Sequence, residues 1–542
     1  MSIVSRVRRA FTICTIAAIT SQFAVFAAKP GVELRVLGTH ATGIYNLGAA
    51  EIVAHDPVTQ RLFVVNGANS SIDVLNVSDP SNPTFLFAID VTPYGDQANS
   101  VDVFDGVVAA AVQADVKTDP GSVVFFNTDG VFLNEVPAGA LPDMITFTPN
   151  GQKVLVANEG EPNSYGQTTS VDPEGSVTIV DLSKGVANAT VTTAGFAAFV
   201  GTTLDPSIRI YGPNASLVQD LEPEYIAVSH NSKTAWVTLQ ENNALGILDL
   251  DSGEFTELIG LGFKDHRLEE NKFDASDRDG VANGPGINIA NWPVYGMYQP
   301  DGIASFKYKN ETFLVTANEG DARDYTGFVE EIRVGASGYP LDPVIFPNAA
   351  ALKTNAQLGR LTVTRATGNT DGGTDFEEIY VLGGRSFSIL KADGEQIYDS
   401  GDDIEQLTKL AYPDNFNANH SCDLPCTATT GNEPDNRSDN KGPEPEGVTV
   451  GKAYGRTYAF IGLERMGGVL VYEITDPYDA KFVQYLNNRN FSAVTNTAAA
   501  LDLGPEGLHF ISEEDSPTGI PLLAVANEVS GTTTVYEFVQ VH

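Results

Sequence analysis

A short phrase recurs along this chain and limits the architectures into which it can fold. It consists of a carboxylate, usually preceded by Pro and often followed by Gly, and it leads into residues that favour β-strands. The copies are PEGV (Pro445 to Val448), PEGL (Pro505 to Leu508), PDGI (Pro300 to Ile303), PEYI (Pro223 to Ile226), PDMI (Pro142 to Ile145), EIV (Glu51 to Val53) and a degenerate NSV that begins at Asn99. Repetition at this scale is typical of folds in which each unit packs against the next.

Apolar runs alternate with turn residues between these phrases. Leu62 to Val77, Lys153 to Leu182 and Ala235 to Leu250 each have the pattern of two short strands joined by a turn rich in Asn, Asp or Gly. No long segment has a convincing helical period. The phrases begin at residues 51, 99, 143, 224, 301, 446 and 506, and the shorter spacings match one propeller blade. We therefore predict an all-β fold, a β-propeller of four-stranded antiparallel blades.

The long gap between residues 301 and 446 decides the predicted number of blades. It contains an additional hairpin, Glu378 to Leu390, and a possible first strand, Arg360 to Ala366, that lacks the acid. Eight blades are therefore favoured, and seven are the alternative. We expect the strand-like segment from Leu34 to Thr42 to pair with the last unit and close the ring, because closure removes free sheet edges.

The first residues have the features of an export signal. Arg6, Arg8 and Arg9 precede a mostly apolar stretch, Phe11 to Phe26, and small residues follow it. We assign residues 1–28 to a signal peptide and residues 29–542 to a single propeller domain with loop insertions at about 263–299, 326–358 and 400–443. No later segment is long and apolar enough to span a bilayer, so the mature chain is expected to be secreted or periplasmic.

The charge balance limits the classes of partner. The chain has 70 Asp and Glu residues against 32 Lys and Arg residues, and its formal net charge is -38. Nucleic acid is bound through Lys and Arg, so it is an unsuitable partner, whereas divalent cations are suitable ones. Asn-x-Ser/Thr sequons occur at Asn69, Asn76, Asn188, Asn214, Asn310, Asn419, Asn436 and Asn490. They can carry glycans only in a host that glycosylates secreted chains.

The acids of the repeated phrase are the first candidate site. If the phrases begin equivalent strands, these acids project around one mouth of the central channel, where like charges raise one another's pKa values unless cations compensate them. One interpretation is that the acids accept backbone hydrogen bonds at blade junctions. The other is that several converge on a divalent cation, calcium above all, because hard ions prefer oxygen ligands.

Acidic loops add further candidate ligands. In DASDRDG (Asp274 to Gly280), Asp277 and Asp279 alternate ahead of a glycine, although the EF-hand spacing is absent, and an ordinary acidic turn is the alternative. The clusters Asn158 to Glu161 and Asn318 to Asp321 follow second strands. The predicted metal ligands are Glu51, Asp143, Glu159, Glu224, Asp277, Asp279, Asp301, Glu319, Asp321, Glu446 and Glu506.

Several longer motifs together resemble one protein family. They include ANEGEPNSY, INIANWPVYGMYQPDGIASF, TANEGDARDY, RSDNKGPEPEGV, GLERMGGVLVYEITDP and LAVANEVSGTT. On these motifs the chain resembles the choice-of-anchor I family, which includes alkaline phosphatase-like secreted proteins. The resemblance covers nearly the whole mature chain and implies a secreted β-propeller, with association with mineralising surfaces in some animal members. An extracellular binding or matrix function is the one that we expect.

An enzymatic function is the alternative hypothesis. Arg323, Arg385 and Arg465 each follow a second strand, where they could clamp a phosphate ester beside Glu446 and a bound metal. In the structural alternative, each arginine neutralises neighbouring acids. The sequence therefore predicts an exported, acidic, calcium-binding extracellular protein, with a metal-dependent phosphomonoesterase as the alternative and the question of catalysis open.

Overall fold

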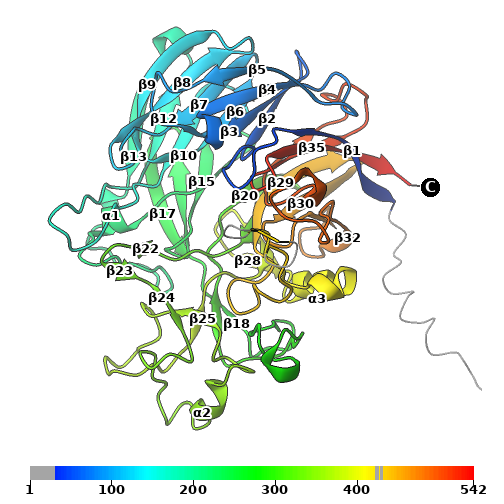
Figure 1. Ribbon diagram of the computed structural model, residues 1–542. Coiled ribbons are helices and arrows are strands. Elements are labelled where there is room, and N and C mark those ends of the chain that lie inside the picture. The colour runs from blue at the N-terminus through cyan, green and yellow to red at the C-terminus, as the bar shows by residue number, and fades with distance from the viewer. Residues whose placement is uncertain (1–30, 422–425, 428–430, 542) are drawn as a thin grey trace, which may run out of the picture.

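The computed structural model describes residues 31–421, 426–427 and 431–541. The predicted signal peptide lies outside this range. Seven four-stranded antiparallel sheets are present among the described residues (Figure 1). The first sheet in chain order consists of β2 Val53–Asp56, β3 Arg61–Asn66, β4 Ser71–Asn76 and β5 Thr84–Asp90, and the second of β6 Ala98–Phe104, β7 Val107–Val112, β8 Pro120–Asn127 and β9 Phe132–Ala140. The third consists of β10 Pro142–Phe147, β11 Lys153–Asn158, β12 Ser176–Asp181 and β13 Thr190–Gly195, and the fourth of β14 Ile226–Val228, β15 Thr234–Leu239, β16 Ala244–Asp249 and β17 Glu254–Gly260.

The other three sheets complete the ring. They are β20 Ile303–Tyr308, β21 Glu311–Asn318, β27 Ser386–Lys391 and β28 Gln396–Asp399; β29 Pro445–Ala453, β30 Arg456–Leu463, β31 Val469–Glu473 and β32 Lys481–Leu486; and β33 Pro505–Ile511, β34 Leu522–Asn527, β35 Thr532–Gln540 and β1 Val32–Ala41. First strands of neighbouring sheets contact one another in the order β2, β6, β10, β14, β20, β29, β33 and back to β2. The prediction of an all-β propeller is therefore confirmed.

Burial follows strand position within each sheet. Second and third strands such as β3 and β4 are almost continuously buried, because both faces of these strands pack against neighbouring sheets. Fourth strands such as β5 and β13 expose most of their residues at the rim. The apolar cores lie between adjacent sheets, for example between the sheets of β10 to β13 and β14 to β17. Apolar side chains buried between adjacent sheets thus hold the ring together.

The ring closes as the sequence predicted. β1 pairs with β35 in antiparallel register, from Val32 opposite Gln540 to Ala41 opposite Thr532. The N-terminal strand therefore supplies the fourth strand of the last sheet.

The favoured count of eight blades is not confirmed. Part of the predicted additional hairpin forms β27, which is the third strand of the sheet that begins with β20. β26 Tyr380–Val381 pairs instead with β19 Tyr295–Met297, and β25 Thr362–Thr364 pairs with β24 Glu331–Arg333. An insertion between second and third strands explains the long gap, and the number of four-stranded sheets equals the alternative of seven.

The insertions form a small lobe on one side of the ring, seen at the bottom of Figure 1. The lobe contains β18 Phe263–Asp265 with β19 and β26, the pair of β24 and β25, and helix α2 Ala349–Leu352. The hairpin of β22 Asp324–Tyr325 and β23 Phe328–Val329 packs instead against Tyr165. Its own apolar core includes Phe273, Val294, Tyr339, Leu358 and Phe376. Segments expected to be loops therefore have a packed core.

Two further helices are short. α1 spans Leu217–Asp220, and α3 spans Asp403–Ala411. Among the described residues, no helix has the length and hydrophobicity needed to cross a membrane.

Candidate functional site

The acids of the repeated phrase meet at one mouth of the ring. Glu506 interacts electrostatically with Glu51, Asp301 and Asp143, although these residues belong to different sheets. Glu224 likewise interacts with Asp143 and Asp301. The acids of the first strands therefore lie close together, as the repeated phrase predicted.

β-Bulges direct several of these acids away from the ladder. Pro142 lies opposite Asn158 and Ile145 opposite Val156, so one extra residue stands on the first strand beside Asp143. The same shift occurs between Pro445 and Val448 and between Pro505 and Leu508. A bulge re-aims a side chain at the rim of a closed sheet structure, and here the side chains are those of the phrase acids.

A left-handed residue before the proline positions a second set of acids. Leu141, Glu444 and Gly504 have φ values of 48°, 55° and 68°. Their carbonyl oxygens accept hydrogen bonds from the backbone N–H groups of the acids that directly follow the second strands, at 2.8–3.0 Å. These acids are Glu159, Glu464 and Glu528, each bonded to the left-handed residue of its own sheet. The mouth therefore carries two sets of acids, one from the first strands and one from the ends of the second strands.

Glycine after the acid allows neighbouring first strands to approach closely. A Cβ atom on Gly447 would lie 1.9 Å from the carbonyl oxygen of Glu506, and one on Gly507 would lie 2.5 Å from that of Glu51. The N–H of Gly507 also donates to the Glu51 carbonyl at 3.0 Å. The glycine of the phrase is thus required by packing between sheets, and it brings successive acids together.

Two triads of acids at the mouth have the same construction. In the first triad, Asp143 comes from a first strand, Glu159 from the end of the second strand of that sheet, and Glu224 from the first-strand phrase of the next sheet. One oxygen of each residue lies within 4.8 Å of one oxygen of the other two. Calcium holds oxygen ligands at about 2.3–2.6 Å, which places opposite ligands about 5 Å apart. The spacing of the first triad therefore suits calcium.

The second triad consists of Asp301, Glu319 and Glu446. One carboxylate oxygen of each residue again lies within 4.8 Å of one oxygen of the other two. Asp301 and Glu319 belong to the β20 sheet and Glu446 to the next sheet, so the three positions match those of the first triad. Here Lys441 from the 400–443 insertion enters the site, and its Nζ lies 2.6 Å from Glu319 Oε1.

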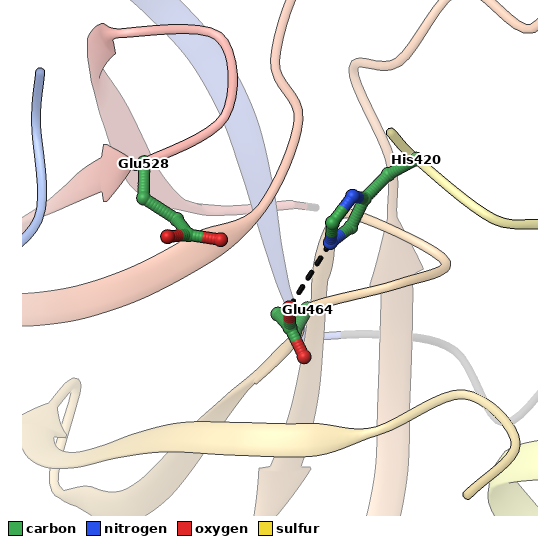
Figure 2. Close-up of side chains that lie close together, drawn as sticks. All are labelled: His420, Glu464 and Glu528. Carbon is green, nitrogen blue, oxygen red and sulfur yellow. Dashed lines mark hydrogen bonds and ion pairs between the residues drawn. The ribbon is translucent and has the colours of Figure 1, made fainter. Parts of the chain in front are cut away.

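Further cations compensate the acids around the second triad. Arg437 Nε lies 2.7 Å from Glu444 Oε1, and Arg465 Nη2 lies 3.0 Å from Glu464 Oε1. His420 also reaches Glu464, with 3.1 Å between Nε2 and Oε1, while Glu528 lies on the other side of Glu464 (Figure 2). Burial lowers the pKa of His420 well below its usual range, so the ring is neutral at pH 7.

The first triad has no such compensation. Asp143, Glu159 and Glu224 make no ion pair within the described part of the chain. Burial and the neighbouring charge of Glu161 raise the pKa of Asp143 to about 7. A side-chain interaction with Glu159 opposes this rise in pKa. A metal ion could replace protons held on these carboxyl groups.

Several carboxylate oxygens near the triads are shielded from solvent and lack hydrogen-bond partners among the described residues. They are Glu241 Oε2, Glu446 Oε2 and Glu506 Oε2. Glu241 is only 6% exposed, and burial together with the charge of Asp321 raises its pKa to about 8. Buried polar atoms without partners are costly, so these oxygens favour the presence of a cation.

The remaining predicted ligands lie elsewhere or at the rim. Asp321 faces Lys441 at 3.8 Å and is half exposed. Asp277 and Asp279 lie with the insertion lobe rather than at the mouth. Asp277 is paired with Arg360 at 2.8 Å, while both carboxylate oxygens of Asp279 are shielded and without a partner among the described residues.

The three candidate arginines are all engaged by acids. Arg323 is 1% exposed and contacts Asp220 and Glu222. Arg385 is 2% exposed and contacts Glu405 at 2.7 Å. Arg465 is the arginine of the three that reaches the acids of the mouth, where it pairs with Glu444 and Glu464. This arrangement corresponds to the structural alternative, in which arginines neutralise acids, and no observation in the described residues favours phosphoester hydrolysis.

Five residues of the mouth and its surroundings were not predicted from the sequence: Glu241, Glu464, Glu528, Lys441 and His420. A signal for Glu464 and Glu528 was present, because each directly follows an apolar second strand, as Glu159 and Glu319 do. No local pattern marks Lys441 or His420, whose partners are 122 and 44 residues away along the chain.

Known proteins resemble this chain in sequence and in architecture. A model of the choice-of-anchor I domain matches residues 51–477. The chain is 31% identical over 193 residues to Gigasin-3a of Magallana gigas, covering 34% of this chain and 66% of that protein. It is 26% identical over 287 residues to a mesenchyme-specific cell surface glycoprotein of Strongylocentrotus purpuratus, covering 48% of this chain and 36% of that protein. The chain thus spans less than two thirds of the length of either relative.

Solved structures also align with this chain, at lower sequence identity than the two relatives above. Kuenenia stuttgartiensis hydrazine synthase aligns with a TM-score of 0.45 and 11% identity over 92% of this chain and 98% of that chain. The β-propeller domain of Cps50 (Swd1) from Myceliophteria thermophila aligns with a TM-score of 0.41 and 9% identity over 94% of this chain and 100% of that chain.

Proposed function

Because this chain belongs to the choice-of-anchor I family, we propose that it is an extracellular β-propeller protein that binds a divalent cation, calcium above all, at the mouth of its channel. The extracellular assignment is supported by the relative that is named as a cell surface glycoprotein. We infer a binding function, such as attachment to extracellular matrix or mineral, rather than catalysis.

One observation carries the metal proposal. Asp143, Glu159 and Glu224 place three carboxylate oxygens within 4.8 Å of one another without an ion pair among the described residues. Desolvated carboxylates that lack a cation destabilise the folded state, whereas a bound ion stabilises it. Carboxylate oxygens alone, without His or Cys in this triad, favour calcium over zinc.

A calcium titration tests the proposal. Protein stripped with a chelator is titrated by isothermal calorimetry, and its thermal unfolding is followed with and without calcium. A ligand that binds only the native state adds about 2.7 kcal/mol at 100 times its dissociation constant. We expect saturable binding by the native protein and loss of that binding in Glu224→Gln.

The matched control is Glu254→Gln, the same substitution at an exposed residue of β17. It should bind calcium as the native protein does. Absence of binding by the native protein, or equal binding by Glu224→Gln, would overturn the proposed function.

A further inference from the structure

The second triad differs from the first in that the protein itself supplies a cation. The Lys441 ammonium lies 2.6 Å from Glu319 Oε1 and 2.5 Å from the carbonyl oxygen of Gly320. It also lies 3.5 Å from Glu444 Oε2. Carboxylate and carbonyl oxygens are the ligands that hard cations prefer, so the ammonium has surroundings of the kind that a calcium ion would have.

The first triad has no equivalent ammonium. Lys441 stands five residues before Glu446, and the residue five before Glu224 is Gln219. Gln219 Nε2 donates to the main-chain oxygen of Asp172 at 2.6 Å instead of entering the mouth. Two sites of the same construction therefore differ in whether the segment that leads into the next sheet brings a positive charge.

We propose that Asp301, Glu319 and Glu446 form a second, latent calcium site, which Lys441 blocks by pairing with Glu319, and that the 400–443 insertion thereby limits the mouth to binding at the first triad. This inference rests on the proposed function, because it assigns the same ligand chemistry to both triads. An oxygen of Glu446 that is shielded and without a hydrogen-bond partner among the described residues remains in the second triad even with the ammonium in place. Lys441 thus satisfies Glu319 and leaves Glu446 incompletely coordinated.

Replacement of the ammonium by an apolar chain of similar length tests the inference. We expect Lys441→Met to bind one more equivalent of calcium than the native protein in a calorimetric titration. Lys441→Arg keeps the positive charge and should bind as the native protein does. Lys184→Met is the matched control, because Lys184 is exposed and remote in the chain from both triads.

The outcomes separate this inference from the proposed function. If the native protein binds calcium and Lys441→Met binds no more, the latent site is refuted while the proposed function stands. If the native protein binds none and Lys441→Met gains a site, the proposed function fails, and the latent site at the second triad is supported by itself. If neither protein binds calcium, both are refuted.

A second measurement applies if Lys441→Met does not fold without metal, since Glu319 then lacks its counter-charge. Far-ultraviolet circular dichroism is recorded during a calcium titration, with sodium chloride at matched ionic strength as the reference. Recovery of the native spectrum by calcium alone supports the latent site. Failure to recover, while Lys441→Arg folds, overturns it.

Discussion

The two triads of the channel mouth are alike in construction and opposite in compensation. In the triad of Asp301, Glu319 and Glu446, Glu319 pairs with the ammonium of Lys441, whereas Asp143, Glu159 and Glu224 have no ion-paired cation among the described residues. Burying a charge is costly unless a counter-charge is close. The difference separates a carboxylate that a protein cation stabilises, Glu319, from carboxylates that need a cation from solution as their counter-charge.

The surroundings of the triads extend this contrast. Near the second triad, Arg437 and Arg465 hold the pKa of Glu444 below its ordinary range despite burial. Near the first triad, burial raises the pKa of Asp143 to about 7 and that of Glu241 to about 8. Protein cations therefore pair with Glu319 and Glu444 on one side of the mouth. Burial raises the pKa values of Asp301 and Glu446 there, as it raises that of Asp143 on the other side, where no such cation pairs with the triad.

Removal of a compensating cation should have the largest effect. Arg323→Ala leaves Asp220 and Glu222 buried without their partner, and we expect a loss of about 3–5 kcal/mol in the free energy of unfolding. Urea denaturation measures this loss. Arg35→Ala breaks an exposed pair with Glu33 and should leave the free energy of unfolding nearly unchanged, because water screens that pair. Equal losses in the two variants would contradict the role of burial.

Neutralising one acid in each triad should change stability in opposite directions. In metal-free protein at pH 9, Asp143→Asn removes an uncompensated charge and should raise the free energy of unfolding by roughly 1–3 kcal/mol. Glu319→Gln removes the carboxylate that pairs with Lys441 at 2.6 Å and should lower the free energy of unfolding by a similar amount. Urea denaturation of the two variants under the same conditions checks both signs. A change of the same sign in both would remove the distinction between the triads.

The sequence predicted the first-strand acids better than the rest of the mouth. The phrase fixed the positions of Asp143 and Glu446, because a repeated unit places equivalent residues at equivalent points of a ring. Glu528 was missed, since it follows its strand without the Gly and second acid that marked Glu159. Pairing of Lys441 with Glu319 joins residues 122 positions apart and depends on how an insertion packs.

The fold was predicted on similar grounds, and there is a physical reason why the favoured number of eight blades was not confirmed. Alternation of short strands and turns sufficed for an all-β propeller. The insertion between β21 and β27 resembled another unit because its strands are also short and apolar. Its residues, including Tyr339 and Phe376, pack with Phe273 of the 263–299 insertion into a lobe core that local periodicity does not reveal.

Calcium binding should strengthen as the pH rises. The folded-state pKa values of Asp143, Glu51 and Glu241, at about 7, 8 and 8, lie above the values of about 4 in an unfolded chain. Native protein thus keeps protons that the unfolded chain has lost, so metal-free stability falls from about pH 4 to about pH 8. Because calcium displaces these protons, its affinity should rise up to about tenfold per pH unit for each proton released. Titrations at about pH 5.5 and 8 in two buffers measure both affinity and proton release, and an affinity independent of pH would contradict this account.

The smallest effect is expected at the rim of the compensated side. Asp321 was a predicted metal ligand, yet its side chain is 54% exposed and lies 3.8 Å from the Lys441 ammonium. Exposed ion pairs contribute less than about 1 kcal/mol, because water screens them and ordering long side chains costs entropy. Asp321→Asn should therefore change the free energy of unfolding by less than about 1 kcal/mol and leave calcium stoichiometry unaltered, in contrast to Glu319→Gln. Loss of calcium binding in Asp321→Asn, measured by the same calorimetric titration, would place the ion beside Lys441 and reverse the assignment of the two triads.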